Sequence, residues 1–366
     1  MKISVLKEIK DNENRVGLTP EGAKALVDAG NDVFVETNAG LNSGFPNEEY
    51  EESGAKIVSK DDAWNSDMVM KVKEPLTEEL QYFTEGKIVY TYFHLSGVYK
   101  ELTEALIDKK TTSVAYETVE DEDGKLPLLK PMSEVSGREA VLFGANYLAK
   151  FNGGNGILIS GVPGTPPANV LILGSGTVGM GAFEIATGLG ANVTITTRNP
   201  DKLKHLESDK VKVIETKKEA IAEAIKDADI VVGGILIAGG KAPKVVTEEM
   251  VKTMKKGSFI ADVSIDQGGC VETSRPTSHS DPVFEKHGVI HYCVTNMPGA
   301  FPRTSTLALT KATLPYALKL AKGLGEAVKD KGLAKGINTY KGFITYKPVA
   351  EDLDMLDKYK DLNELL

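Results

Sequence analysis

The sequence predicts an α/β protein made of two Rossmann-like domains, each with a doubly wound parallel sheet, and with a cleft between the domains. Three observations support this fold class. A glycine-punctuated turn follows an apolar strand, strand and helix patterns alternate along the chain, and 366 residues exceed what one core comfortably holds.

The glycine-rich turn follows the apolar run 169–173 and has the form G-x-G-x-x-G. Gly174 would make a tight turn, Gly176 would let the backbone approach a pyrophosphate, and Gly179 would let the next helix pack close to the strand. The helix N-terminus would then present free N–H groups to the phosphates. A glycine-rich turn in an ordinary α/β domain is the alternative, but strand, glycines and helix in register favour a dinucleotide site.

The remaining elements alternate in type. Thr19-Pro20-Glu21 is typical of a helix start and Gly30 of its end. Repeated strand and helix units imply mostly parallel sheets with right-handed crossovers. We expect strands at 3–8, 33–36, 68–73, 88–93, 191–197, 230–233 and 259–263, and helices at 101–109, 137–150, 180–188 and 306–323, with Pro315 as a kink or boundary in the last.

Composition limits the function classes. The net charge of −9 and the lack of a dense Lys/Arg stripe argue against a nucleic-acid partner. No apolar run is long enough for a membrane span, and the N-terminus enters a strand at once, so a cytoplasmic location is expected. Cys270 and Cys293 lack the spacing of a zinc site, and no metal is expected. Cys270 follows two glycines and could be reactive, but buried filler is favoured.

Polar residues that follow strands are the candidates for chemistry, because ligands of parallel sheets lie beyond the carboxyl ends of the strands. Arg15 and Lys73 could hold a substrate carboxylate. His94 could move the proton that accompanies hydride transfer, and Asp266 could orient a water or the nucleotide ribose. Taken singly, each has a plainer interpretation as a surface charge, a structural histidine or a turn residue. Their joint position at strand ends favours a site.

These residues lie in strings that resemble the alanine dehydrogenase and nicotinamide nucleotide transhydrogenase family. The resemblance covers nearly the whole chain, and several strings are more specific than the glycine pattern. The chain length and the context of His94 are similar to the alanine dehydrogenases rather than to the membrane-linked transhydrogenase subunit. The strings are Lys7-Glu8-Ile9-Lys10, Glu13-Asn14-Arg15-Val16, Val72-Lys73-Glu74-Pro75, His94-Leu95, 132–138, Gly161-Val162-Pro163-Gly164, 265–270 and Asn296-Met297-Pro298.

The resemblance implies reversible oxidative deamination of L-alanine to pyruvate and ammonia. Arg15 and Lys73 would grip the carboxylate, His94 would be the acid/base group, and Asp266 would assist water or carbinolamine chemistry. It also implies a substrate domain of residues 1–127 plus 304–366, a dinucleotide-binding domain of residues 128–303, and a homohexamer. The implied cofactor contacts are Ser133, Gly174, Gly176, Thr177, Val178, Gly179, Thr197, Arg198, Lys202, Ile235, Leu236, Ile265, Asp266, Arg275, Asn296, Met297, Pro298 and Gly299.

The chain departs from the family where an acid commonly ends the second strand and binds the adenosine ribose. Thr197 lies at about the expected spacing of 20 residues beyond the first glycine, and Arg198 follows it. Loss of the acid removes repulsion against a 2′-phosphate, which Arg198 could bind. Arg198 could equally be solvated, with Asp201 turned back to the ribose. NAD and NADP therefore both remain open.

Two other functions fit the same scaffold. The substrate could be another small amino or imino acid, including a reductive amination, and the side-chain pocket, with Tyr92, Met132 and Tyr116 as candidate walls, would decide this. Alternatively, the chain could be a transhydrogenase-like subunit that only binds nucleotide. A carboxylate clamp next to a histidine argues against a pure binding module.

Overall fold

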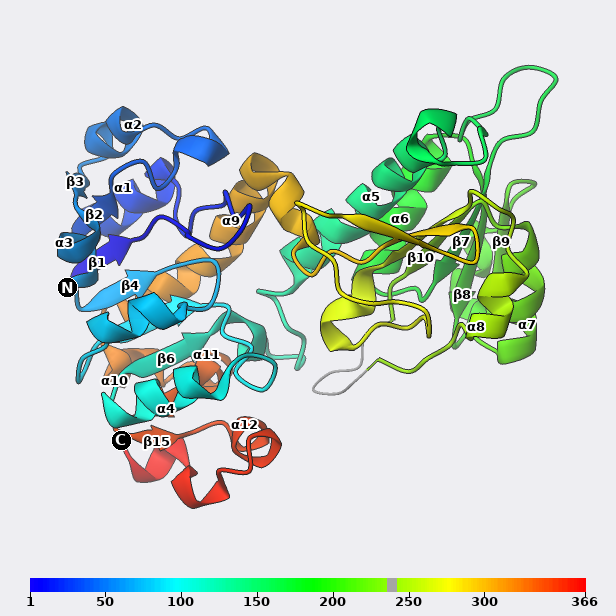
Figure 1. The fold of residues 1–366 in the computed structure, drawn as a ribbon. Coiled ribbons are helices and arrows are strands. Elements are labelled where there is room, and N and C mark those ends of the chain that lie inside the picture. The colour runs from blue at the N-terminus through cyan, green and yellow to red at the C-terminus, as the bar shows by residue number, and fades with distance from the viewer. Residues whose placement is uncertain (236–241) are drawn as a thin grey trace. The chain divides into compact units, whose positions relative to one another are not determined.

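The computed structural model describes residues 1–235 and 242–366 (Figure 1). The chain divides into two compact units: Met1–Met132 with Phe301–Leu366 form the first, and Ser133–Ala300 form the second. Each unit has a largely parallel sheet surrounded by helices. The predicted α/β class and the presence of two domains are therefore confirmed.

In the first unit, whose residues are all described, the sheet has eight strands in the order β15-β14-β6-β5-β4-β1-β2-β3. β1 to β6 pair in parallel, whereas β14 pairs antiparallel with both β6 and β15. β4, β5 and β6 are buried along their whole length, as expected at the centre of a covered sheet. The strands are β1 (Lys2–Val5), β2 (Asp32–Glu36), β3 (Lys56–Val58), β4 (Met68–Met70), β5 (Ile88–Thr91), β6 (Thr112–Ala115), β14 (Ile337–Tyr340) and β15 (Phe343–Ile344).

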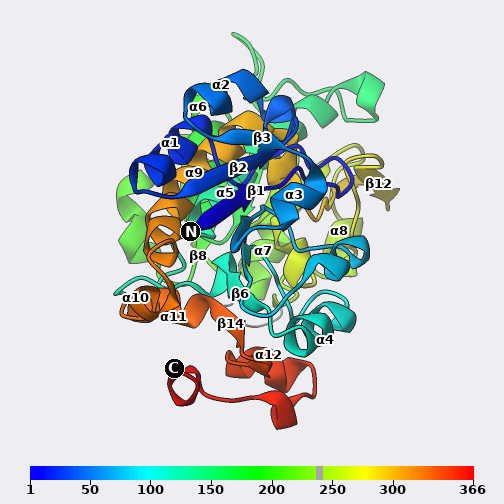
Figure 2. The same ribbon diagram turned by 90° about the vertical axis from the view of Figure 1, so that its left-hand side faces the viewer.

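Helices pack around this sheet. At the start of α1 the Thr19 hydroxyl accepts the N–H of Gly22 at 3.2 Å, and Pro20 fills the first turn, as the sequence predicts. Trp64 of α3 and Leu106 of α4 share an apolar cluster, while α1 packs against α9 (Figure 2). The helices are α1 (Pro20–Asp28), α2 (Asn47–Glu52), α3 (Lys60–Trp64), α4 (Lys100–Asp108), α9 (Pro302–Leu320), α10 (Leu324–Ala327), α11 (Lys331–Gly336) and α12 (Lys347–Asp352).

Helix α9, near the C-terminal end of the chain, forms hydrogen bonds with two loops of the N-terminal part. The Thr306 hydroxyl accepts the N–H of Val16 at 3.2 Å and lies 3.0 Å from the Ser43 hydroxyl. Pro315 lies inside α9, so the prediction of a helix boundary there is wrong. The helix ends at Leu320, before the expected residue 323.

In the second unit the described strands follow the order β12-β13-β11-β10-β7-β8-β9, parallel except for β12 against β13. Alternate residues of β7 enter different cores: Val170 and Ile172 belong to one apolar cluster, Leu171 and Leu173 to another. This alternation is the period of two of a strand buried on both faces. The elements are β7 (Asn169–Leu173), β8 (Asn192–Thr197), β9 (Val211–Glu215), β10 (Ile230–Gly233), β11 (Phe259–Asp262), β12 (Val283–Lys286), β13 (Val289–Tyr292), α5 (Lys130–Tyr147), α6 (Thr177–Gly188), α7 (Lys218–Ala224) and α8 (Glu248–Lys252).

Several predicted elements have different ends. β4 stops at Met70 rather than residue 73, and β5 stops at Thr91 rather than residue 93. In both cases carboxylates take the backbone N–H groups that a longer strand would give to its neighbour. The helix expected at 137–150 begins earlier, at Lys130, and ends at Tyr147. The antiparallel strands β12, β14 and β15 were not predicted.

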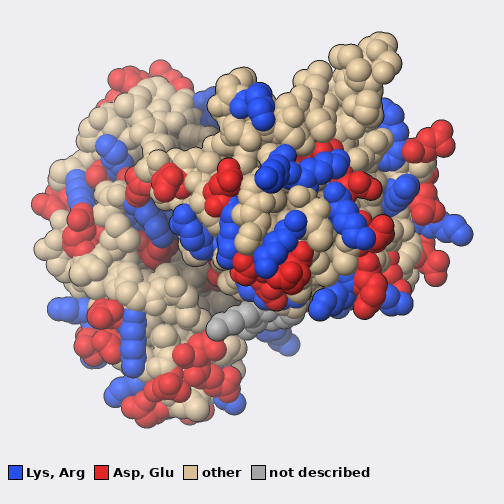
Figure 3. Space-filling model, turned by 45° about the vertical axis from the view of Figure 1, so that its right-hand side comes forward, with Lys and Arg blue, Asp and Glu red and all other residues tan. Residues whose placement is uncertain are grey.

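The surface carries charged side chains of both signs. On the face drawn in Figure 3, basic and acidic side chains intermingle. Across residues 1–235 and 242–366, no helix combines the length and apolar character that a bilayer crossing needs. Within these same ranges, His, Cys, Asp and Glu side chains do not gather in threes as a metal site requires.

Candidate functional site

The candidate substrate residues of the first unit follow neighbouring strands of one sheet. Arg15 lies beyond β1, Lys73 beyond β4 and His94 beyond β5, and these strands are adjacent and parallel. Glu117 follows the next strand, β6. All four side chains therefore come from the carboxyl edge of the sheet, where ligands of parallel sheets bind.

Arg15 is held by a carboxylate that the sequence analysis did not single out. Its Nε and Nη2 atoms lie 2.7 and 2.6 Å from the two oxygens of Glu13, in a bidentate pair with both side chains buried. Its Nη1 donates to the Met132 sulfur at 3.1 Å. Burial alone would lower the pKa of Arg15, but the charge and hydrogen bonds of Glu13 outweigh it and raise the pKa. The guanidinium is therefore charged and fixed in orientation.

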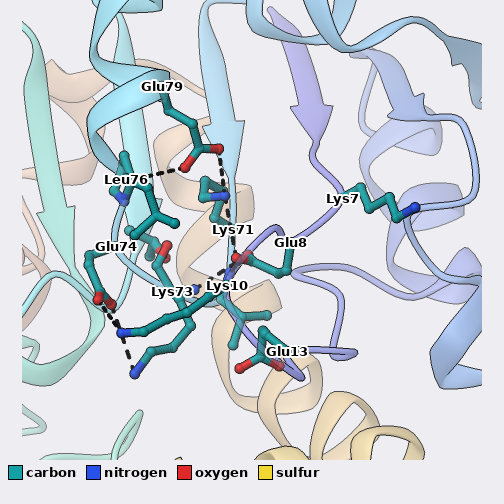
Figure 4. A network of polar contacts seen from close by, with 12 residues as sticks. Lys7, Glu8, Lys10, Glu13, Lys71, Lys73, Glu74, Leu76 and Glu79 are labelled. Atoms are coloured by element: carbon teal, nitrogen blue, oxygen red, sulfur yellow. Dashed lines mark hydrogen bonds and ion pairs between the residues drawn. The ribbon is translucent and has the colours of Figure 1, made fainter.

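Lys73 lies in the loop after β4 and is mostly buried, with its side chain 13% exposed. Its Nζ lies 3.9 Å from Oε2 of Glu74, which also pairs with Lys10 (Figure 4). Burial would raise the pKa of Glu74, but the two lysines outweigh it and lower the pKa. The carbonyl of Lys73 accepts the Thr91 hydroxyl at 3.0 Å. Both ends of the residue are thus constrained by neighbours from the same sheet edge.

His94 has a strained backbone and an exposed ring. Its φ of 49° lies in the left-handed region, which a non-glycine residue occupies only when its surroundings hold it there. Glu117 provides that constraint, because its two oxygens accept the N–H groups of Phe93 at 3.2 Å and His94 at 2.6 Å. The imidazole stacks on the Tyr92 ring, with centroids 5.7 Å apart. The side chain is thereby placed just beyond the end of β5, where it is exposed.

The three candidate pocket walls differ in position. Tyr92 stacks on His94, and Met132 contacts Arg15, so both border the candidate substrate residues. Tyr116 is fully buried and meets Tyr92 edge-on at 4.9 Å. It backs Tyr92, so the expectation that Tyr116 lines the pocket is wrong.

The glycine-rich turn has the geometry that its residue types allow. Gly174 has a φ of 97°, which side-chain-bearing residues rarely adopt, and its N–H donates to Thr196 at 2.9 Å. A Cβ on Gly179 would lie 1.9 Å from the Gly174 carbonyl oxygen, so helix and turn touch through backbone. A Cβ on Gly176 would meet no atom within 4 Å. The turn is therefore packed on one side and open at Gly176, the N-cap of α6.

β8 ends at Thr197, a hydroxyl residue at the position where many dinucleotide-binding domains have an acid. Thr197 is buried, and its Oγ1 accepts from the Ser175 hydroxyl at 3.0 Å and the Asn199 N–H at 3.3 Å. Arg198 and Lys202 are exposed beside it, Lys202 in the turn η5 (Pro200–Leu206). Glu215, in register with Thr197 on β9, forms an ion pair with Lys217 at 2.6 Å.

The loop after β11 is organised by a buried acid that the sequence analysis overlooked. Asp262 accepts the N–H groups of Ser264, Cys270 and Val271 at 3.2, 3.1 and 3.0 Å. Asp266 is exposed in the turn η7 (Val263–Gln267) that Asp262 caps. Cys270 is buried against Asp262, and burial raises its thiol pKa, which agrees with a filler role.

The other expected cofactor residues are spread over neighbouring segments of the second unit. Ser133 is half-buried in α5, Ile235 follows β10, and Leu236 lies outside the described residues. Arg275 lies over the Phe284 ring at 4.2 Å. The turn η8 (Met297–Ala300) follows Asn296, whose carbonyl accepts from the His279 ring at 2.7 Å. The turns after β7, β8, β10, β11 and β13 thus hold most of these residues, at the carboxyl ends of adjacent strands.

Two family models match the chain: "Alanine dehydrogenase/PNT, N-terminal domain" over residues 4–136 and "Alanine dehydrogenase/PNT, C-terminal domain" over residues 140–347. The chain belongs to the alanine dehydrogenase/PNT family. The resemblance drawn from the sequence motifs is confirmed.

Individual members of the alanine dehydrogenase/PNT family match from end to end. "Alanine dehydrogenase 2" of Staphylococcus aureus (strain USA300) is 53% identical over 373 residues, which cover 100% of both chains. A solved structure titled "L-alanine dehydrogenase" has a TM-score of 0.93 at 45% identity, covering 97% of this chain and 99% of the other. A solved "transhydrogenase from Sinorhizobium meliloti" has a TM-score of 0.80 at 27% identity, covering 94% and 99%.

Proposed function

We propose that this member of the alanine dehydrogenase/PNT family interconverts L-alanine with pyruvate and ammonia, using a nicotinamide dinucleotide. The position of Arg15, Lys73 and His94 beyond three adjacent strands carries the proposal. Two cations can hold a carboxylate, and one imidazole can move a proton. Full-length relatives named alanine dehydrogenase support the same activity.

The substrate carboxylate would bind Arg15 and Lys73. Glu13 accepts from the Nε and Nη2 atoms of Arg15, so the carboxylate would approach on the Nη1 side, where the Met132 sulfur is one of the contacts. A thioether is a weak acceptor, so a carboxylate oxygen competes well for this donor. Lys73 adds a second positive charge without requiring a fixed geometry. The two contacts would fix the substrate Cα for reaction.

His94 would handle the proton. Hydride loss from Cα of the free amine leaves an iminium ion, which takes up water to give a carbinolamine protonated on nitrogen. This carbinolamine loses ammonia as its hydroxyl proton passes to the His94 imidazole. The reverse reaction returns that proton from His94. Glu117 and Tyr92 hold the ring in place through the backbone and through stacking. Asp266 would orient the water.

The second unit would hold the dinucleotide, and a bound nicotinamide ring supplies the hydride acceptor. The residues fit, because a side chain at Gly176 would fill the open side of the turn at the N-terminus of the 12-residue helix α6. Cofactor contacts are proposed for Ser133, Gly174, Gly176, Thr177, Val178, Gly179, Thr197, Ile235, Leu236, Ile265, Asp266, Arg275, Asn296, Met297, Pro298 and Gly299.

Activity measurements test the proposal. Purified protein with L-alanine and either NAD or NADP should produce reduced nicotinamide absorbance. His94→Ala should lower kcat at least 100-fold and leave cofactor affinity within about twofold, since general acid–base catalysis contributes about 100-fold or more. His287→Ala, at a second histidine of positive φ in the turn between β12 and β13, is the matched control. Absence of turnover with both cofactors contradicts the proposal, and tight nucleotide binding without turnover favours a transhydrogenase-like subunit.

We also propose that the chain accepts NADP as well as NAD. Thr197 carries no charge to repel a 2′-phosphate, and Arg198 and Lys202 are exposed beside it. Arg198→Ala should weaken NADPH binding about tenfold and leave NADH binding unchanged, as the loss of one charge-assisted contact predicts. Equal NADPH affinity in both proteins, measured by fluorescence titration, would remove Arg198 from this role.

A homohexamer in the cytoplasm is the assembly and location that the family resemblance implies. Exposed apolar side chains of the second unit, Phe151, Leu158 and Val162, support self-association. Light scattering after size-exclusion chromatography measures the assembly, and a monomer at working concentration contradicts it. Cell fractionation measures the location.

A further inference from the structure

A buried ionic network lies directly behind Lys73. Lys71 is fully buried just after β4, and its Nζ lies 2.9 Å from Oε1 of Glu79 and 3.3 Å from Oε2 of Glu8. The two carboxylates are also buried, with side chains 1% and 2% exposed. Burial lowers the pKa of Lys71, but the two carboxylates outweigh it and raise the pKa, so Lys71 stays charged. The network therefore joins one ammonium to two carboxylates in the interior (Figure 4).

The second oxygen of each carboxylate accepts hydrogen bonds from backbone N–H groups of residues 72–76, here called the Lys73 segment. Oε1 of Glu8 accepts the N–H groups of Val72 at 2.6 Å and Lys73 at 3.4 Å. Oε2 of Glu79 accepts the N–H of Leu76 at 2.8 Å. The network thus holds the Lys73 segment at both of its ends.

The same network reaches Arg15. Glu8 belongs to residues 6–15, the segment that runs from β1 to Arg15, so its bonds to Val72 and Lys73 join the two cation-bearing segments. The ion pair between Lys10 and Glu74 joins them a second time. The backbone of Lys71 is itself fixed, because its carbonyl accepts the Tyr116 hydroxyl at 3.0 Å. The distance between Arg15 and Lys73 therefore depends on this network.

Stability alone gives a weak reason for such a network. Buried ions lose hydration, and well-packed apolar side chains of similar size often stabilise a fold equally well or better. An apolar replacement would, however, leave the N–H groups of Val72, Lys73 and Leu76 without these acceptors. The network supplies orientation that packing cannot.

We propose that Glu8, Lys71 and Glu79 are positioning residues that set the geometry of the Arg15 and Lys73 carboxylate clamp. The inference rests on the proposed function of that clamp. These three side chains would act through the backbone of the Lys73 segment and of residues 6–15, without contact to the substrate.

Steady-state kinetics of Glu8→Gln and Glu79→Gln test this role. Both variants keep side-chain size and lose one charge. The KM for pyruvate and L-alanine should rise about tenfold or more, because displacements near 1 Å carry losses of up to about 100-fold. The KM for the cofactor should stay within about twofold. Lys7→Ala, an exposed residue whose side chain points away from the network in Figure 4, should leave all constants unchanged.

A purely structural role gives a different pattern. It would lower the melting temperature and the active fraction while the KM for pyruvate stays at the wild-type value, and that outcome overturns the inference. If a single variant fails to fold, the neutral triple variant Glu8→Gln/Lys71→Met/Glu79→Gln removes all three charges together. A folded triple variant should still show a raised pyruvate KM, and a wild-type KM overturns the inference. If neither variant type folds, the network is a folding requirement and the inference is likewise overturned. Wild-type protein without alanine turnover would instead contradict the proposed function.

Discussion

Replacing Gly179 by alanine tests the contact between the glycine-rich turn and α6. The added Cβ would lie 1.9 Å from the Gly174 carbonyl oxygen, whereas real Cβ atoms essentially never approach such a neighbour within 3.0 Å. Helix and turn must therefore separate by about 1 Å, a displacement that carries losses of up to about 100-fold at a binding or reacting group. Overpacking of this kind also costs about 1–3 kcal/mol of folding free energy.

Gly188→Ala is the matched control for this prediction. It lies at the other end of α6, and a Cβ there meets nothing within 4 Å. It should leave stability unchanged or raise it by less than the about 0.5–1 kcal/mol that alanine gains over glycine inside a helix. Fluorescence titration with NADH and thermal unfolding measure both variants. Gly179→Ala protein that binds NADH with wild-type affinity would refute the close-packing argument, as would an equal loss in Gly188→Ala.

Three further predictions follow from buried groups. Glu13→Gln breaks the buried ion pair with Arg15, so the free energy of unfolding measured in urea should fall by about 3–5 kcal/mol and the KM for pyruvate should rise. An unchanged KM would show that Glu13 does not orient Arg15 for substrate binding. Burial lowers the pKa of His291 below 6.5, so the unfolded chain binds more protons than the folded protein between the two pKa values. The stability contribution of His291 is therefore present above pH 6.5 and is lost as pH falls through the lower folded pKa. Urea melts between about pH 5 and 8 should show a smaller change of unfolding free energy with pH in His291→Gln, and an equal change in both proteins would exclude His291. Asp262→Asn replaces a carboxylate that accepts three backbone N–H groups in the loop after β11, so NADH binding should weaken about tenfold in a fluorescence titration. Wild-type NADH affinity in this variant would show that the loop does not contribute to cofactor binding.

Features that depend on local sequence could be predicted. The turn at Gly174 follows from glycine spacing next to an apolar strand, and its φ of 97° shows why glycine is required there. Arg15, Lys73 and His94 could be selected because parallel strands bring their carboxyl ends to one edge of a sheet. Short residue strings around these same positions are specific enough to indicate the family.

Features that depend on distant pairing could not be predicted. β14 is only four residues long, and its partner β6 lies far away in the sequence, so no local pattern indicates the antiparallel pairing. The partners of Arg15 and Leu76 are close in sequence, at Glu13 and Glu79, so there the missing information was which acids the fold buries. Glu8, Glu79 and Asp262 look like ordinary acids until the fold buries them against backbone N–H groups.

The late position of β14 affects how a nascent chain matures. Ser113 and Thr339 bond to each other although they are 226 positions apart. At about 5–20 residues per second, a ribosome needs roughly 11 to 45 seconds between the two. During that interval β6 offers an unsatisfied edge to any passing strand, which is a recognised route to aggregation. Production of this protein in a host should accordingly be sensitive to chaperone supply, and messages cut short before codon 337 should yield insoluble product.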